Sequence, residues 1–187
     1  MSVSGVAGGT NPKATRVSRI VHRGRSIVVQ VERAELPGGL SVELDVVRHP
    51  GAAAVVPFES DDVVLLIRQF RHAVGGTIWE VPAGKLDGEA PQVCAARELE
   101  EEVGRRAGRL LPLASILTTP GFTDEVIHLF AAFELTPVPQ RLEHDEVIEV
   151  VPMPLARALE LVWSGELRDA KSALALLHAA RRLGLLG

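Results

Sequence analysis

Hydrophobic and polar residues alternate with a period of two in the first ordered part of the chain. The alternation covers residues 27–32 and 41–46, and Pro37-Gly38-Gly39 lies between the two runs. Such alternation is typical of half-buried strands, and a Pro-Gly-Gly segment favours a turn, so residues 15–49 are predicted to form a β-hairpin appendage. A lone hairpin is marginal in water, so this one must pack on the rest of the chain or on a second copy of it.

Beyond residue 50 the apolar runs become continuous, which indicates buried strands followed by helices. Strands are predicted at 52–57, 62–70, 77–81, 110–118, 125–135 and 146–152, and helices at 91–103, 154–164 and 170–183. Asp169 is expected to cap the last helix. The apolar face of that helix is expected to consist of Ala173, Leu174, Leu177, Ala180 and Leu183. The order of elements predicts an α/β domain over residues 50–187, with a mixed sheet and helices on both faces.

Composition narrows the class of protein. The chain has 187 residues, a net charge of −4 and no basic run, so nucleic acid is not expected as a partner. It has no apolar run of about 18 residues, so no membrane span is expected. Residues 1–14 lack a secretory signal and are predicted to be a disordered tail, which favours a cytoplasmic location. Cys94 is the only cysteine, which excludes an internal disulfide and a cysteine-based zinc site.

An acidic cluster follows a glycine-containing loop at residues 82–89. Glu98, Glu101 and Glu102 are spaced i, i+3 and i+4, so on a helix they share one face. Such a run is often only a solvated helix face. Here Arg97 lies one turn from Glu101 as an ion-pair partner, and apolar residues give the helix a core-facing stripe. Converging carboxylates are the ligands that a hard cation such as Mg²⁺ needs.

These residues resemble the Nudix box, G-x5-E-x7-R-E-U-x-E-E-x-G-U, in which U is a bulky apolar residue. The matching positions are Glu89, Arg97, Glu98, Leu99, Glu101, Glu102 and Gly104. Two positions depart from the pattern. Only four residues separate Gly84 from Glu89, which puts the placement of Glu89 in question, and Arg105 stands where the family has an apolar residue.

The resemblance implies a Nudix-type α/β/α sandwich that hydrolyses a nucleoside diphosphate linked to another group. It implies that Glu98, Glu101, Glu102 and the backbone carbonyl of Ala83 hold two or three Mg²⁺ ions, with Mn²⁺ as the alternative metal. Arg97 joins the catalytic set as the partner of these carboxylates. No membrane or nucleic-acid partner is implied.

Sequences outside the box resemble the ADP-ribose pyrophosphatase branch of the family. The strings I-R-Q-F-R and W-E-V-P-A-G carry this likeness, as does T-P-G-F-T-D-E at residues 119–125. The likeness implies that Arg71 and Arg68 contact the substrate phosphates. The other residues that it implies near the substrate are Trp79, Glu80, Pro120, Phe122 and Thr123. A solvated charge, a core tryptophan and an ordinary turn are the structural alternatives for these positions.

The general base is expected in the acidic loop before the strand at 146–152. Glu146 is favoured, and Glu143 and His144 are its rivals, since each is able to accept a proton near neutral pH. The predicted function is Mg²⁺-dependent cleavage of ADP-ribose to AMP and ribose 5-phosphate. The alternatives are a broader nucleoside diphosphate sugar hydrolase, for example on GDP-mannose, and a non-catalytic domain that binds ADP-ribose. The branch also implies a homodimer that exchanges the N-terminal appendage.

Overall fold

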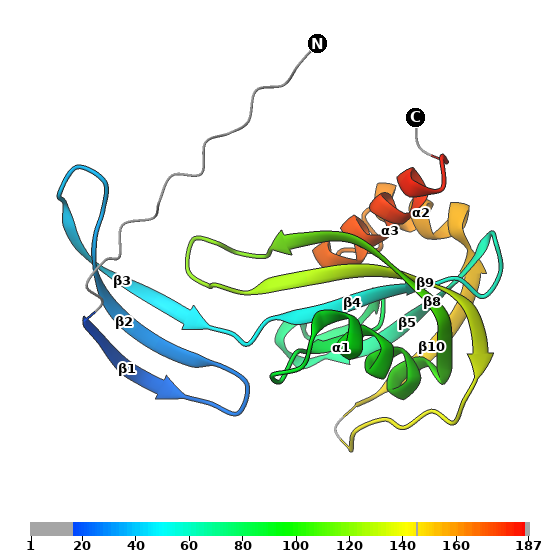
Figure 1. Cartoon of the computed structure of the whole chain (residues 1–187), viewed down its shortest axis with the longest axis horizontal. Helices are drawn as coiled ribbons and strands as arrows, with labels where there is room; N and C mark the ends of the chain where they lie inside the picture. The colour runs from blue at the N-terminus through cyan, green and yellow to red at the C-terminus, as the bar shows by residue number, and fades with distance from the viewer. Residues whose placement is uncertain (1–16, 145, 186–187) are drawn as a thin grey trace, which may run out of the picture. The chain divides into compact units, whose positions relative to one another are not determined.

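The computed structural model describes residues 17–144 and 146–185, and the predicted tail at 1–14 lies outside them. The chain divides between Arg48 and His49 into two compact units (Figure 1). The first unit is an antiparallel sheet of β1 (Val17–Arg23), β2 (Val28–Glu35) and β3 (Ser41–Arg48). The hairpin predicted from the alternating residues is β2–β3, and the structure adds β1 as a third strand.

The turn between β2 and β3 is built by the glycines of the Pro-Gly-Gly segment. Gly38 and Gly39 both have positive φ, at 93° and 82°, a backbone conformation that disfavours residues with a Cβ. The N–H of Gly39 donates to the carbonyl of Leu36 at 3.0 Å, and the N–H of Leu36 donates to Leu40 at 2.8 Å. The turn therefore sets the register in which Glu35 lies opposite Ser41.

The described residues of the second unit form two sheets and three α-helices. One sheet has the order β10-β5-β6 and the other the order β7-β4-β9-β8. Their strands are β4 (Ala52–Pro57), β5 (Val63–Arg71), β6 (Gly76–Glu80), β7 (Ala83–Lys85), β8 (Arg105–Leu117), β9 (Val126–Pro137) and β10 (Ile148–Pro154). The helices are α1 (Pro91–Glu98), α2 (Leu155–Trp163) and α3 (Ala170–Arg182), with a 3-10 turn at His72–Val74 and a π-helical segment at Leu99–Val103. β4 pairs in parallel with β9 and antiparallel with β7, so the sheet is mixed.

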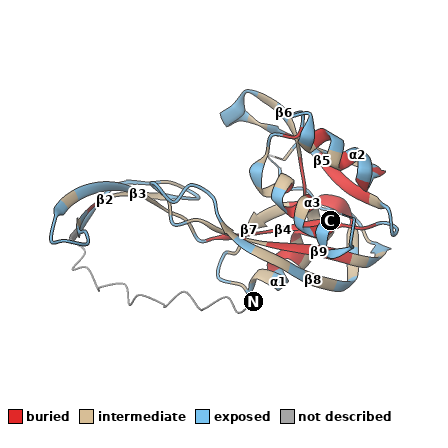
Figure 2. Ribbon diagram, turned by 90° about the horizontal axis from the view of Figure 1, so that it is seen from above, coloured by how far each residue is buried: buried red, intermediate tan, exposed pale blue. Residues whose placement is uncertain are grey.

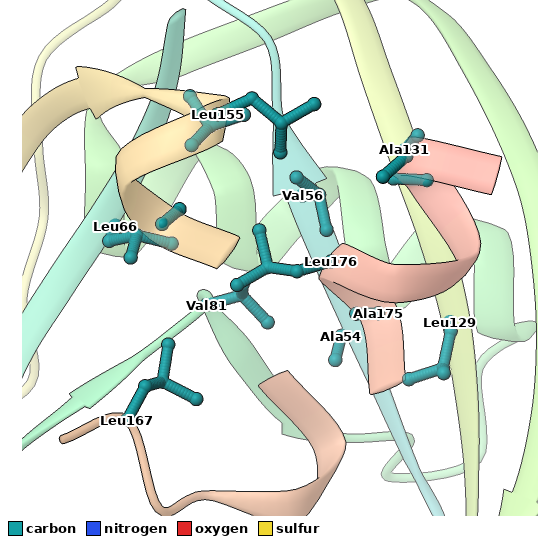
Figure 3. Packing of buried hydrophobic residues seen from close by; sticks show 14 of the residues in the cluster. Ala54, Val56, Leu66, Val81, Leu129, Ala131, Leu155, Leu167, Ala175 and Leu176 are labelled. Atoms are coloured by element: carbon teal, nitrogen blue, oxygen red, sulfur yellow. The ribbon is translucent and has the colours of Figure 1, made fainter. Parts of the chain in front are cut away.

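Strand β4 is buried on both faces, as its continuous apolar run predicts. Ala54 and Val56 pack in a core with α2 and α3, whereas Ala53 and Val55 pack in a second core with α1. Figure 3 shows Val56 near Leu176 of α3 in the first of these cores. Figure 2 shows the buried residues of β4 and β9 along the centre of this unit. Helices thus cover both faces, and the predicted α/β/α sandwich is confirmed.

Strands β4 and β5 follow one another in the chain but belong to different sheets. An isolated bridge between Phe58 and Val64 is the antiparallel link at their turn. Alternate residues of β5 also serve the two cores, since Leu66 packs toward α2 and α3 and Leu65 packs toward α1. Each fully buried leucine of this kind stabilises the fold by about 1.5–3 kcal/mol.

The last helix confirms one prediction and corrects another. The N–H of Ser172 donates to Oδ2 of Asp169 at 3.0 Å, which is the predicted N-cap. The predicted apolar face is correct for Ala180, which is buried, and for Ala173, which packs against the core. It is wrong for Leu174 and Leu183, which are exposed, and it omits Ala175 and Leu176, which are buried. Small residues allow α3 to pack closely on the sheet, a requirement that hydrophobicity alone does not reveal. Within the described residues, no helix has the length and apolar character needed to cross a membrane.

Candidate active site

The box helix changes its winding partway along. α1 begins at Pro91, a residue suited to the first helical turn, and continues as a π-helix from Leu99 to Val103. Gly104 then ends the segment in the left-handed conformation, with φ of 67°. The predicted helix 91–103 is therefore present, although its last turn is wider than an α-helix. Short π-helical turns are frequent at functional sites.

Two box carboxylates lie in the interior. Glu98 and Glu102 are 7% and 2% exposed, respectively. Burial, followed by the nearby charge of Glu98, raises the pKa of Glu102 to about 8. Burial likewise raises the pKa of Glu98, although the charge of Arg97 opposes this effect. Two desolvated carboxylates that repel one another form a site in which a cation is favourable.

The loop between β6 and α1 is fitted closely to these carboxylates. The N–H of Ala83 donates to Oε2 of Glu102 at 2.9 Å. Gly84 lies against Glu98, and a Cβ added to Gly84 would come within 1.7 Å of Oε1 of that residue. The thiol of Cys94 donates to the carbonyl of Gly84 at 3.4 Å. A larger residue at this position would have to displace the Glu98 carboxylate, and the φ of Gly84, which is not positive, does not itself call for glycine.

Arg97 organises the remaining acidic groups. Its guanidinium donates to Glu89 at 2.7 and 2.9 Å, to Glu98 at 2.7 Å and to Glu101 at 2.9 Å. Burial lowers the pKa of Arg97, but the hydrogen bonds to Glu89 and Glu101 outweigh burial and raise it. Glu89 reaches Arg97 although the loop is one residue shorter than the Nudix pattern. The other departure, Arg105, pairs with Glu59 at 2.9 Å and lies outside this cluster.

A second ion cluster lies at the ends of β5 and β6. Arg71 donates from Nε and Nη2 to the two oxygens of Glu80, at 2.7 and 2.9 Å. Lys171 of α3 also donates to Glu80, which is 1% exposed. The hydrogen bond to Glu80 raises the pKa of Arg71, and the charge of Glu102 raises it further. Arg71 therefore lies within electrostatic range of Glu102, the more deeply buried of the two interior box carboxylates.

Arg68 and Trp79 form a pair on the opposite face of β5 and β6. They are register partners, and the guanidinium of Arg68 lies 5.4 Å from the centre of the Trp79 ring. Successive strand residues point to opposite faces, so this pair does not share the face of Arg71 and Glu80. The indole N–H of Trp79 donates to Glu166 at 3.3 Å.

The loop between β8 and β9 carries Pro120, Phe122 and Thr123. The N–H groups of Phe122 and Thr123 both donate to the carbonyl of Thr119 at 3.1 Å. Asp124 accepts a hydrogen bond from the N–H of His49 at 2.9 Å. Phe122 is 53% exposed. In the described residues these bonds join the loop to itself and to His49, and they do not bring Phe122 or Thr123 into the carboxylate cluster.

The loop before β10 is anchored to the box helix at its start. The amide of Gln140 donates to the carbonyl of Glu102 at 2.6 Å, and the N–H of Arg141 donates to Glu101 at 2.9 Å. Further along, Oε2 of Glu146 accepts from the N–H of Glu143 at 2.8 Å. The charge of Glu146 contributes to the raised pKa of Glu102, after burial and Glu98.

Glu143 and His144 are exposed, whereas Glu146 is half-buried. Among the three candidates for the general base, Glu146 is therefore the least exposed, and its charge acts on the box carboxylates. This effect is visible in both Glu98 and Glu102, because the charge of Glu146 also raises the pKa of Glu98 after burial.

The donor set suits a hard cation, but the side chains are not gathered around one point. In residues 17–144 and 146–185, no three Asp, Glu, His or Cys side chains form a ready metal-binding group. Arg97 holds Glu98 and Glu101, while Glu102 is turned to the N–H of Ala83. Carboxylate oxygens are the ligands that Mg²⁺ prefers, and two of these groups are buried with raised pKa values, so the residues fit the ion chemically.

Sequence reasoning missed Lys171, Asp169 and Gln140. Lys171 reaches Glu80 from 91 residues along the chain, and it also donates to Asp169 at 2.9 Å. No local spacing connects them to the box, although Asp169 was recognisable as a helix cap. Gln140 carried no signal, because a single polar residue in a loop has no distinguishing pattern.

The comparisons with known proteins agree with this fold and box. The NUDIX domain family model matches residues 47–174. The chain therefore belongs to the Nudix family, and the assignment made from the box is confirmed. A solved structure titled an ADP compounds hydrolase superposes with a TM-score of 0.79 at 24% identity, covering 93% of this chain and 97% of that one.

Curated relatives cover most of the chain. An ADP-ribose pyrophosphatase of Bacillus subtilis is 42% identical over 161 residues, which are 84% of this chain and 87% of the relative. A protein of Bacillus methanolicus named methanol dehydrogenase activator is 37% identical over the same length and the same shares. Proteins named GDP-mannose pyrophosphatase also match, at 38% identity. Among these relatives, the ADP-ribose pyrophosphatase supports the predicted branch of the family.

Proposed function

We propose that the protein is a Mg²⁺-dependent hydrolase that cleaves ADP-ribose to AMP and ribose 5-phosphate. The observation that carries the proposal is the buried pair of Glu98 and Glu102, with Arg71 within electrostatic range of Glu102. Carboxylates for a cation and a guanidinium for phosphate are what a diphosphate requires. The ADP-ribose pyrophosphatase at 42% identity supports this choice of substrate.

The reaction is a displacement at phosphorus by water. The water oxygen bonds to one phosphorus atom, the bridging P–O bond breaks, and the water proton passes to a base. Arg71 is assigned to the phosphate oxygens, whose negative charge would otherwise repel the incoming oxygen. Arg97 is assigned to hold Glu89, Glu98 and Glu101 in position, in keeping with its bonds to all three.

Glu98, Glu101, Glu102 and the carbonyl of Ala83 are proposed to hold the metal, as two or three Mg²⁺ ions or Mn²⁺. Bound there, the ions neutralise the diphosphate charge and favour ionisation of water. Glu98 and Glu101 would have to exchange Arg97 for the cation in part. Activity measured with a chelator, then with Mg²⁺ or Mn²⁺ restored, tests the requirement, and undiminished turnover in chelator would refute it.

Glu146 is proposed as the general base, with Glu143 and His144 as rivals. The influence of Glu146 on the pKa values of Glu98 and Glu102 supports it. The variants Glu146→Gln, Glu143→Gln and His144→Gln separate the three. The base is the residue whose loss lowers kcat most, by about 100-fold or more, and removes the acidic limb of the pH–rate profile.

The adenosine and ribose contacts are proposed from the branch resemblance. Trp79, Arg68, Pro120, Phe122 and Thr123 belong to this part of the proposal. The exposure of Phe122 supports it, since an exposed aromatic side chain is available for stacking. If Phe122→Ala left the KM for ADP-ribose unchanged, this assignment would be wrong for that residue.

A hydrolysis panel of ADP-ribose, GDP-mannose, UDP-glucose and dinucleotides tests the substrate. ADP-ribose should give the highest kcat/KM, and a preference for GDP-mannose would replace the proposal with the broader alternative. Calorimetry with ADP-ribose tests the non-catalytic alternative. A pure binding domain gives a saturating isotherm without release of AMP.

We also propose a homodimer formed through the first unit. Glu32 is the only buried residue among the described residues of its three strands, while Ile20, Val21 and Leu44 are exposed. A sheet without a core of its own is stabilised when another surface covers it. Light scattering after gel filtration should give twice the monomer mass. A cytoplasmic location, where nucleotide sugars occur, completes the proposal, and cell fractionation tests it.

A further inference from the structure

Glu80 is a buried carboxylate that accepts hydrogen bonds from two cations. Arg71 occupies both of its oxygens, and Lys171 adds a bond to Oε2. The side chain of Lys171 is 13% exposed, whereas that of Arg71 is 40% exposed. Glu80 is therefore held by a largely buried lysine, Lys171, and by an arginine, Arg71, whose side chain is partly exposed to solvent.

Lys171 belongs to a rigid part of the molecule, the first turn of α3. Asp169 caps this helix through the N–H of Ser172 at 3.0 Å and also pairs with Lys171 at 2.9 Å. The buried hydroxyl of Ser172 accepts from the N–H of Val81 at 2.8 Å. The start of α3 is thus fastened to two consecutive residues, Glu80 and Val81, just before the loop that contacts Glu102.

The orientation of Arg71 depends on Glu80. A bidentate carboxylate fixes the plane of a guanidinium, provided that the carboxylate itself does not rotate. The bond from Lys171 to Oε2 restrains this rotation, and without it Arg71 alone of these two cations would hold the Glu80 carboxylate. Removal of Lys171 would therefore let Glu80 turn, and Arg71 would turn with it.

We propose that Lys171 is a positioning residue, which holds the Glu80 carboxylate in the orientation that presents Arg71 to the substrate diphosphate. This inference rests on the proposed function, because it assigns Arg71 to the phosphates. Lys171 contacts no reacting atom in this scheme. Lys171, on α3, contacts Glu80, and Glu80 in turn orients Arg71.

A double-mutant cycle of Lys171→Met and Arg71→Ala tests the route. In the wild-type background, K171M should raise KM for ADP-ribose by roughly 10-fold and lower kcat by less, as expected for lost binding of the substrate. In the R71A background, K171M should change kcat/KM by less than about 2-fold, because the residue through which it acts is gone. Lys171→Arg, which keeps a cation for Glu80, should recover most of the KM.

The control is Arg157→Gln, which removes one positive charge and one exposed ion pair on α2 and should leave KM unchanged. If the effects of K171M and R71A on kcat/KM are additive, Lys171 does not act through Arg71 and the inference is overturned. A loss of thermal stability in K171M with unchanged KM would overturn it as well, since that is the result of a purely structural role.

If K171M does not fold, Glu80→Gln replaces it in the cycle, because this change breaks the same connection and preserves the shape of the side chain. Calorimetric binding of a methylene-bridged ADP-ribose analogue to the four proteins gives a readout independent of turnover. Wild-type protein that neither cleaves ADP-ribose nor binds the analogue would refute the proposed function. Wild-type activity with an additive cycle would refute only the role of Lys171.

Discussion

The backbone N–H of Ala83 donates a hydrogen bond of 2.9 Å to Oε2 of Glu102, the most deeply buried box carboxylate. This bond joins the loop after β6 to the π-helical end of the box, 19 residues further along. The Glu102 carboxylate thus accepts a hydrogen bond from a neutral backbone group, while the charges of Glu98 and Glu146 act on it. The loop and the helix therefore depend on each other for their geometry, and each can be tested separately.

Glu102→Gln should lower Mg²⁺-dependent turnover by about 100-fold or more, the size expected when one electrostatic element of a site is removed. The amide oxygen still accepts from Ala83, so the fold should be retained, as judged by circular dichroism. Glu100→Gln is the matched control. It is the same chemical change in the same helical segment, but Glu100 pairs with Arg106. Near wild-type turnover in E102Q would contradict the metal assignment.

The metal-free protein should become less stable as pH rises from about 5 to about 8. The pKa of Glu102 is raised from 4.5 to about 8, mainly by burial, so the folded state holds a proton that the unfolded state has lost. Stability therefore declines through this window, by at most about 1.4 kcal/mol per pH unit. Thermal melts in chelator measure it, and the slope should be smaller in E102Q. A Tm that rises over this range in both proteins would contradict the raised pKa.

Gly84→Ala should destabilise the protein by about 1–3 kcal/mol and reduce turnover, because the new methyl group must displace Glu98. The Cβ would lie within 1.7 Å of Oε1 of Glu98, so the carboxylate or the loop has to move. Gly76→Ala is the control, since no atom lies within 4 Å of its Cβ position. Equal effects of the two changes in denaturant unfolding and kinetic assays would show that the contact is unimportant.

Arg97→Lys should lower activity by roughly 10–100-fold, as expected when a residue that orients metal ligands is changed. A lysine keeps the charge, but it cannot reach Glu89, Glu98 and Glu101 together with the planar geometry of a guanidinium. Titration with Mg²⁺ should show that R97K needs a higher Mg²⁺ concentration than the wild type for half-maximal activity. Arg106 pairs with Glu100 and not with these metal-ligand candidates among the described residues, so Arg106→Lys is the control and should behave like the wild type.

The strands were predictable because β4 and β5 are buried on both faces and so appear as unbroken apolar runs. The box carboxylates were also found from sequence, because their spacing is local. The network of Glu80, Lys171 and Asp169 was not, since its members meet only after the last helix packs on the sheet. The buried face of α3 was predicted only in part: Ala180 was included, but Leu174 and Leu183 are exposed. Ala175 and Ala179 are buried because their small side chains let α3 pack closely on the sheet, and a hydrophobicity pattern does not report side-chain size.

The attachment of α3 to Glu80 and Val81 has a consequence for synthesis of the protein on the ribosome. Both partners, Lys171 and Ser172, lie 91 residues after the residues that they hold. A nascent chain that already contains the box and its glutamates still lacks the support for its phosphate-binding arginine. Catalytic competence would then begin only after Lys171 and Ser172 have been synthesised, so products shortened before these residues would carry the family signature without a finished site.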